Sequence, residues 1–350
     1  YTRGEDSRRY YLAQFEHVYG QPLKQVWTDW IEWEHAFQQA NLEAIRQYPI
    51  TPVRDLSDRA LGSVSRAFLD AESRKIFAAF NYPGVVAHIG SISVDDGNVD
   101  KIEDIKGPVI YSVTSMAYDE ERRQIFYTTD NLAYRDLRVI DPEKGKSKIL
   151  LKDARIGDLV FNRSDRSIWG IRHFNGFTTL VRVPYPYDQW EQIHSWPYGE
   201  VLYNLDLSGD GSLLSASIGE INGDHSLQVW ETAALLGGKV EPVETVSFGT
   251  TIPSNFVFSP DGRYLFGSTY YTGASNIFRY ELATDEIEVV SNSETGLFRP
   301  IPLEDGSLIV FRYTGEGFVP GVIEPEPLED VAAITYLGNE VIAKHPVLED

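Results

Sequence analysis

The chain has 350 residues, of which 42% are apolar and 13% aromatic, and its formal net charge is −21. This size allows one large domain or two ordinary ones, and the acidic balance argues against nucleic acid and anionic membranes as partners. The chain has no cysteine, which excludes disulfides and thiolate metal sites, and no apolar run long enough to insert into a membrane as a helix.

Residues 1–49 are predicted to be a helical segment. Apolar and aromatic residues recur there at spacings of three and four, and Tyr48-Pro49 ends the pattern because a residue before proline avoids the helical region. Trp27, Trp30 and Trp33 lie along about two turns, so we expect this face to be buried against the rest of the chain or against another domain. Because the chain opens at Tyr1 without a methionine, we expect it to continue an upstream domain.

From Ile50 onward the sequence predicts strands in a sixfold repeat, with intervals of 43 to 51 residues. Each repeat has a short strand, a tight turn and an apolar residue six positions after the turn begins. The turns begin at Asp70, Asp119, Asn162, Ser208, Ser259 and Leu303. A period of this length filled with short strands is typical of a β-propeller. We therefore predict a mainly β chain in which residues 50–350 form a six-bladed propeller, closed by strands from Ile50–Asp55 and Val331–Val347.

Three of the turns carry a recognisable repeat. Ser208-Gly-Asp-Gly-Ser-Leu-Leu214 and Ser259-Pro-Asp-Gly-Arg-Tyr-Leu265 resemble the turn of TolB-like, WD40-like propellers, and Glu304-Asp-Gly-Ser-Leu308 is a shorter copy. The Asp-Gly pair suits a tight turn, because Gly tolerates positive φ and Asp bonds back to the backbone. The resemblance covers residues 60 to 320. It implies a repeat class found in binding, scaffold and enzyme-accessory domains.

The helical segment adds a second resemblance. Phe15-Glu-His-Val-Tyr-Gly20 and Trp27-Thr-Asp-Trp-Ile-Glu-Trp33 resemble the helical end of a gluzincin-type metallopeptidase domain. Such domains can precede a TolB-like propeller in bacterial envelope proteins, which implies a periplasmic or envelope location and a role accessory to a peptidase. The zinc motif His-Glu-x-x-His does not occur in the chain, and neither does a Gly-x-Ser-x-Gly elbow or a phosphate-binding loop. We therefore assign no catalytic residue, cofactor or metal.

A polar position recurs on the strand before each turn. Counting back four residues gives Arg66, Ser115, Asp158, Asn204, Asn255 and Arg299. Neighbouring positions such as Phe68, Val160 and Val257 are largely apolar, so the sequence predicts a polar ring around a water-lined central channel. The loops after the second strands are expected at the same mouth. Their candidate ligand-binding residues are Asp130, Tyr134, Arg135, His173 and Tyr270.

Two arginines against one aspartate in this ring indicate an anionic ligand, such as a peptide carboxylate. Polar inner-strand residues can equally tie blades together and bind water, which is the competing interpretation. The favoured hypothesis is a non-catalytic module that binds protein or peptide. The alternative is a lactonase-like hydrolase with a channel-bound calcium ion, for which the ring offers Asp158, with Asp206 and Asp130 nearby.

Overall fold

The computed structural model describes residues 7–105, 115–130, 134–329, 331, 334 and 344–345. The chain divides into two compact units, one of Tyr1–Pro49 with Ile334–Asp350 and one of Ile50–Ala333. Within the described residues no helix is both long and apolar enough to cross a membrane.

The N-terminal unit contains the predicted helical segment as two helices, α1 (Ser7–Tyr19) and α2 (Leu23–Ile45). Gly20 ends α1 with φ of 72°, and its N–H donates to the carbonyl oxygen of Glu16 at 2.8 Å. Glycine adopts this left-handed conformation without the penalty that a Cβ would impose, so it stops the helix cleanly. Pro22 then precedes the first residue of α2, where its missing N–H costs no hydrogen bond.

The tryptophan face of α2 is about half exposed in this chain. Trp27, Trp30 and Trp33 are 57%, 46% and 41% exposed. The rings cover one another along the helix: Trp27 lies 5.1 Å from Trp30, and Trp33 stacks on Phe37 at 5.3 Å. One-turn neighbours therefore shield only part of each ring, and burial of this face against another domain stays a prediction.

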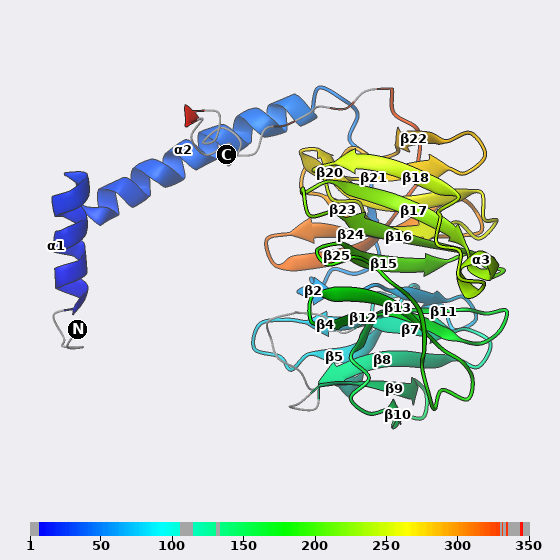
Figure 1. Cartoon of the computed structure of the whole chain (residues 1–350). Coiled ribbons are helices and arrows are strands. Elements are labelled where there is room, and N and C mark those ends of the chain that lie inside the picture. The colour runs from blue at the N-terminus through cyan, green and yellow to red at the C-terminus, as the bar shows by residue number, and fades with distance from the viewer. Residues whose placement is uncertain are drawn as a thin grey trace. The chain divides into compact units, whose positions relative to one another are not determined.

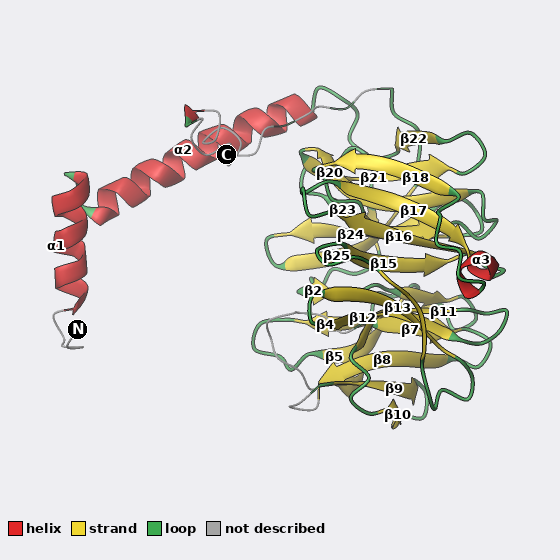
Figure 2. Ribbon diagram, viewed as in Figure 1, coloured by secondary structure: helices red, strands yellow, loops and turns green. Residues whose placement is uncertain are grey.

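The second unit is a six-bladed β-propeller, as predicted (Figures 1 and 2). Blade 1 contains β2 (Ser63–Val64), β3 (Phe68–Asp70), β4 (Lys75–Asn81), β5 (His88–Ser93) and β6 (Val99–Asp104). Blade 2 contains β7 (Met116–Asp119), β8 (Gln124–Asp130), β9 (Arg135–Asp141) and β10 (Lys146–Leu151). Blade 3 contains β11 (Ile156–Phe161), β12 (Ile168–Phe174), β13 (Phe177–Val183) and β14 (Glu191–Ser195).

The remaining blades repeat this antiparallel order. Blade 4 contains β15 (Val201–Leu207), β16 (Leu213–Gly219), β17 (His225–Glu231) and β18 (Glu244–Gly249), with the short helix α3 (Thr232–Leu236) between the last two. Blade 5 contains β19 (Ser254–Phe258), β20 (Tyr264–Thr272), β21 (Ala274–Glu281) and β22 (Glu286–Val289). Blade 6 contains β23 (Leu297–Pro302), β24 (Leu308–Thr314), β25 (Gly317–Ile323) and, as its outer strand, β1 (Arg54–Asp55).

Strand β1 ties the start of the propeller to its last blade. Arg54 pairs with Val322 and Asp55 with Gly321, and Arg312 donates to the Asp55 carboxylate at 2.6 Å. This pairing covers the edge of blade 6 and leaves fewer open backbone groups. The second predicted closing segment, Val331–Val347, lies almost entirely outside the described residues.

The core lies between the blades. Six clusters of buried apolar side chains each join two adjacent sheets. Between blades 3 and 4, for example, Trp169 and Trp230 are 0% and 1% exposed. A fully buried side chain of this kind contributes roughly 1.5–3 kcal/mol. The circle of sheets therefore holds its inner strands, and the side chains they present to the axis, in fixed positions.

Candidate ligand-binding channel

A bulge in the innermost strands directs the predicted ring residues toward the axis. The ladder slips between Gly157 and Val160 in blade 3, and at the same place in blades 4, 5 and 6. At this slip the ring residues are left-handed: φ is 44° at Asp158, 56° at Asn204, 52° at Asn255 and 50° at Arg299. Asp and Asn tolerate this conformation better than other residues with a Cβ, which explains their recurrence. A bulge of this type re-aims a side chain out of the normal alternation.

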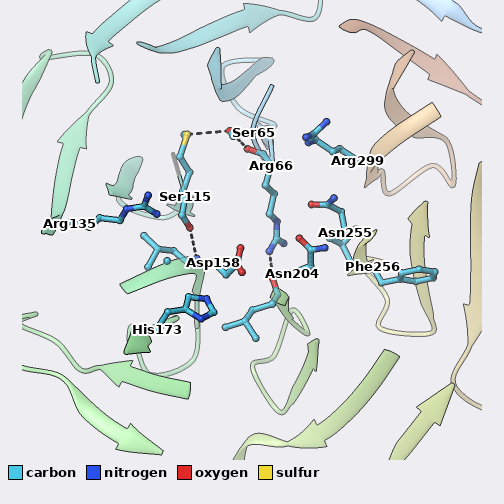
Figure 3. Close-up of a pocket in the computed structure, with 15 residues that line it drawn as sticks. Ser65, Arg66, Ser115, Arg135, Asp158, His173, Asn204, Asn255, Phe256 and Arg299 are labelled. Atoms are coloured by element: carbon cyan, nitrogen blue, oxygen red, sulfur yellow. Dashed lines mark hydrogen bonds between the residues drawn. The ribbon is translucent and has the colours of Figure 1, made fainter. Parts of the chain in front are cut away.

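All six ring residues line one cavity of about 280 Å³, which we call the polar cavity (Figure 3). Arg135 and His173, from β9 and β12, line it as well. Three other candidates do not. Asp130 forms an ion pair with Arg135, while Tyr134 and Tyr270 lie about half exposed, and none of the three is part of this lining. The ring and two loop-side residues are therefore brought together.

Arg66 does not leave the channel open as predicted. Its side chain reaches from blade 1 to blade 4, where it donates to the Leu205 carbonyl oxygen at 2.5 Å and forms an ion pair with Asp206. Asp206 is 5% exposed, and its other oxygen accepts the N–H of Phe258 at 2.7 Å. The charge of Arg66 is therefore already compensated, which removes it from the list of free anion-binding groups.

Arg299 differs from the other arginines of the cavity. Arg135 pairs with Asp130 at 3.3 Å, whereas Arg299 has no carboxylate partner within the described part of the chain. Its guanidinium carbon lies 5.1 Å from the centre of the Phe318 ring. Burial lowers the pKa of Arg299 to about 10, with no charged neighbour opposing the shift. An arginine deprived of water and of a counter-ion can readily bind an anion.

Asp158 and His173 line the same cavity, and their pKa values are shifted in opposite directions. Burial raises the pKa of Asp158, although the backbone N–H of Asn204 and the charges of His173, Arg66 and Arg135 oppose the rise. The pKa of His173 is lowered, chiefly by desolvation and further by Arg135, against the attraction of Asp158. Both shifts favour neutral forms, so the cavity lining holds less charge than its composition indicates.

A second cavity of about 600 Å³ lies at the turn end of the inner strands. Its walls include the residue just before each turn: Leu69, Tyr118, Phe161, Leu207, Phe258 and Pro302. We call this space the apolar funnel after these six side chains, although Glu120, Arg163, Asp206, Glu304 and Asp305 also line it. Arg66, Asn255, Val257 and Arg299 line both cavities, so Arg299 lies at the junction. The sequence interpretation missed the funnel, although an apolar residue before all six turns was visible as its signal.

The site does not match what a calcium ion requires. Calcium takes six to eight oxygen ligands, usually with several carboxylates. Within the described residues no group of three or more His, Cys, Asp or Glu side chains is placed to hold a metal. Of the carboxylates proposed for that role, Asp206 and Asp130 are paired with arginines, and only Asp158 lines the polar cavity.

The fold has TolB-like structural neighbours. TolB from Acinetobacter baumannii superposes with a TM-score of 0.53 at 12% identity, over 74% of this chain and 65% of that one. A gluconolactonase from Xanthomonas campestris gives a TM-score of 0.55 at 12% identity, over 79% of this chain and 90% of that one. A puromycin-hydrolyzing peptidase from Mycobacterium tuberculosis gives 0.51 at 12% identity, over 81% and 50%.

At these identities the likeness concerns the fold alone, and the chain spans less than two thirds of the TolB chain. No protein-family model matches the sequence. No curated protein matches it either.

Proposed function

We propose that this chain is a non-catalytic binding module whose channel receives a carboxylate carried by a protein or peptide. The observation that carries this proposal is the position of Arg299, which lies at the junction of the polar cavity and the apolar funnel without a carboxylate partner among the described residues. A carboxylate placed against this guanidinium would supply the missing counter-charge and could form two parallel hydrogen bonds.

The apolar funnel supports a peptide chain end as the source of that carboxylate. A peptide entering from the turn face would pass the six apolar side chains of the funnel before its terminal carboxylate reached Arg299. The funnel lining combines these side chains with charged ones, among them Glu120, Glu304 and Asp305, and apolar walls with a few placed polar groups are typical of sites that fix the orientation of a ligand. Asn255 lines both cavities and can hydrogen-bond the last peptide group.

The wider context of the module is also a proposal. The chain covers half of a solved peptidase, which supports a scaffold or accessory role beside a peptidase domain in a longer polypeptide. We also propose a periplasmic or envelope location, which the TolB-like fold supports. The fold likeness to a gluconolactonase favours a calcium-dependent hydrolase as the second candidate, but the channel offers it one unpaired carboxylate.

The test uses N-acetylated tetrapeptides with apolar side chains, each prepared as the free acid and as the amide. We expect the free acids to bind and the amides to bind at least about tenfold more weakly. The variant Arg299→Asn removes the cation and keeps a residue suited to φ of 50°, as Asn204 and Asn255 show at the equivalent positions. It should abolish the preference for the free acid.

Arg312→Gln serves as the matched control, because Arg312 is paired with Asp55 at the outer edge of blade 6. It should leave the preference unchanged. Equal binding of acid and amide by the unaltered chain would contradict the proposal. Calcium-dependent lactone hydrolysis lost in Asp158→Asn would favour the second candidate instead.

A further inference from the structure

A row of alternating aromatic rings and arginines lies between blades 2 and 3. The Arg155 guanidinium carbon is 3.3 Å from the centre of the Tyr134 ring and 5.0 Å from that of Phe174. The Arg172 guanidinium carbon lies 5.4 Å from the centre of the same Phe174 ring and 4.8 Å from the centre of the Trp190 ring. We call these five residues the arginine–aromatic ladder.

The ladder is held by the backbone as well as by stacking. Arg155 is left-handed with φ of 57°, a conformation that costs a residue with a Cβ roughly 1–2 kcal/mol. Its N–H donates to the carbonyl oxygen of Arg135 at 3.0 Å. Phe174 opens a two-residue hairpin whose Asn175 and Gly176 have φ of 50° and 79°, the geometry of an Asn-Gly turn. Backbone strain of this kind, here at the half-buried Arg155, clusters at functional sites.

Blade 5 contains a comparable arrangement with a different charge balance. Arg263 and Arg279 each lie 4.7 Å from the centre of the Tyr264 ring. Both are neutralised, since Arg263 pairs with Glu281 at 2.6 Å and Arg279 pairs with Glu288. Arg155 and Arg172, by contrast, form no ion pair with any described residue.

Stacking leaves these two arginines prepared for an anion. Each guanidinium uses its flat face against an aromatic ring, and although the Nε–H of Arg172 donates to the Ala154 carbonyl oxygen at 3.4 Å, the terminal N–H donors of both arginines remain available for a carboxylate. The rings of Tyr134, Phe174 and Trp190 are 48%, 45% and 37% exposed, and exposed aromatic residues beside arginine are the groups that dominate protein interfaces. On a chain of net charge −21, two adjacent uncompensated arginines are a local exception.

We propose that the arginine–aromatic ladder is a second binding site, separate from the channel, which docks an acidic peptide segment of a partner protein. Arginine clusters recognise acidic motifs through charge-assisted hydrogen bonds, and a pre-stacked guanidinium loses less conformational freedom on binding. Because the ligand is an internal segment, its recognition does not depend on a free carboxyl terminus or on Arg299.

The test uses the full chain and a fluorescent peptide with six consecutive glutamates, acetylated and amidated so that no terminal carboxylate is present. We expect measurable binding by fluorescence anisotropy, and no binding of the matched six-glutamine peptide. Arg155→Asn suits the left-handed backbone, and Arg172→Gln alters the other end of the ladder. Each should raise the Kd about tenfold.

Arg263→Gln is the matched control, because it removes a stacked arginine that already has a carboxylate partner. It should leave the Kd unchanged. Arg155→Lys keeps the charge but loses the planar stack, and should weaken binding about as much as Arg155→Asn. Equal effects of the ladder and control variants would overturn the proposal, as would binding of a galacturonate hexamer in place of the glutamate peptide. Arg299→Asn should leave glutamate-peptide binding intact, which separates this result from that of the channel.

Discussion

The Arg166 guanidinium of blade 3 lies 2.5 Å from the Asp119 carboxylate of blade 2, and this pair fastens the two blades at their turns. Asp119 is 1% exposed, and Arg166 adopts φ of 61° in the turn that follows β11. One blade earlier, Arg123 repeats the arrangement with Asp70 at 3.0 Å and φ of 54°. The turns that depart from the Ser-x-Asp-Gly pattern therefore carry inter-blade ion pairs.

Asp119→Asn is expected to lower the free energy of unfolding by about 3 kcal/mol, because it removes the buried partner of the largely buried Arg166 charge and leaves only the exposed Glu121. The measurement is equilibrium unfolding in denaturant. Glu121→Gln provides the control, since Glu121 also contacts Arg166, at 3.2 Å, but is 82% exposed. It should cost less than about 1 kcal/mol. Similar losses in both variants would refute a special role for the buried pair.

Asp70 should make stability depend on acid pH. Burial alone would raise the pKa of Asp70, but the Ser73 hydroxyl, the Arg123 charge and the backbone N–H groups of Ser73 and Glu72 outweigh it and hold the pKa below 3.8. The unfolded chain therefore takes up this proton first as the pH falls. The stabilisation is present above the ordinary pKa and is lost as the pH falls through the folded value.

Asp70→Asn cannot titrate, so it should lose less stability than the unaltered chain between about pH 5 and pH 3. Unfolding curves at several pH values measure this difference. Glu143→Gln changes the exposed partner of Arg123 and should follow the unaltered chain. Parallel pH profiles for the unaltered chain and Asp70→Asn would contradict the assignment.

Asp158→Asn should raise stability at neutral pH, in contrast to Asp70→Asn. The pKa of Asp158 is raised in the folded state, chiefly by burial, so the folded chain holds this proton more tightly than the unfolded chain. Stability then falls as the pH rises from the ordinary value of 3.8 toward the folded one. Asparagine avoids this penalty and fits the left-handed position.

The stabilising effect of Asp158→Asn should therefore grow above pH 4 and vanish at about pH 3. Thermal unfolding across this range measures it. Asn204→Asp, the reverse change at the equivalent position of the next blade, should destabilise at neutral pH. A loss of stability in Asp158→Asn at neutral pH would show that the Asp158 carboxylate contributes to the fold.

The ring could be predicted from sequence because the turns fix the register of the inner strands. Counting back from Asn162 or Ser208 reaches Asp158 or Asn204 whatever the intervening loops do. The regular alternation of side chains along a strand would place the residue three positions after a ring residue on the opposite face, so the funnel was not predicted. The bulge at the ring position interrupts that alternation. Arg66 reaches an ion-pair partner 140 residues away, which no local pattern reveals.

At the left-handed ring positions we expect a glycine variant to be more stable than an alanine variant, which reverses the usual order. Asn255 has φ of 52°, whereas Ser254, one residue earlier in β19, is not left-handed. At position 255 alanine retains a Cβ and loses the tolerance of asparagine, at a cost of roughly 1–2 kcal/mol. Glycine avoids that cost but gives the unfolded chain more freedom, worth about 0.5–1 kcal/mol.

Asn255→Gly should therefore be more stable than Asn255→Ala by about 1 kcal/mol. Ser254→Ala should be more stable than Ser254→Gly by a similar amount, because an ordinary strand position favours alanine. Equilibrium unfolding of the four variants measures both differences. Each comparison is between glycine and alanine at one site, so the loss of the original side chain cancels. If alanine were the better residue at both positions, the bulge would not govern the backbone of the ring.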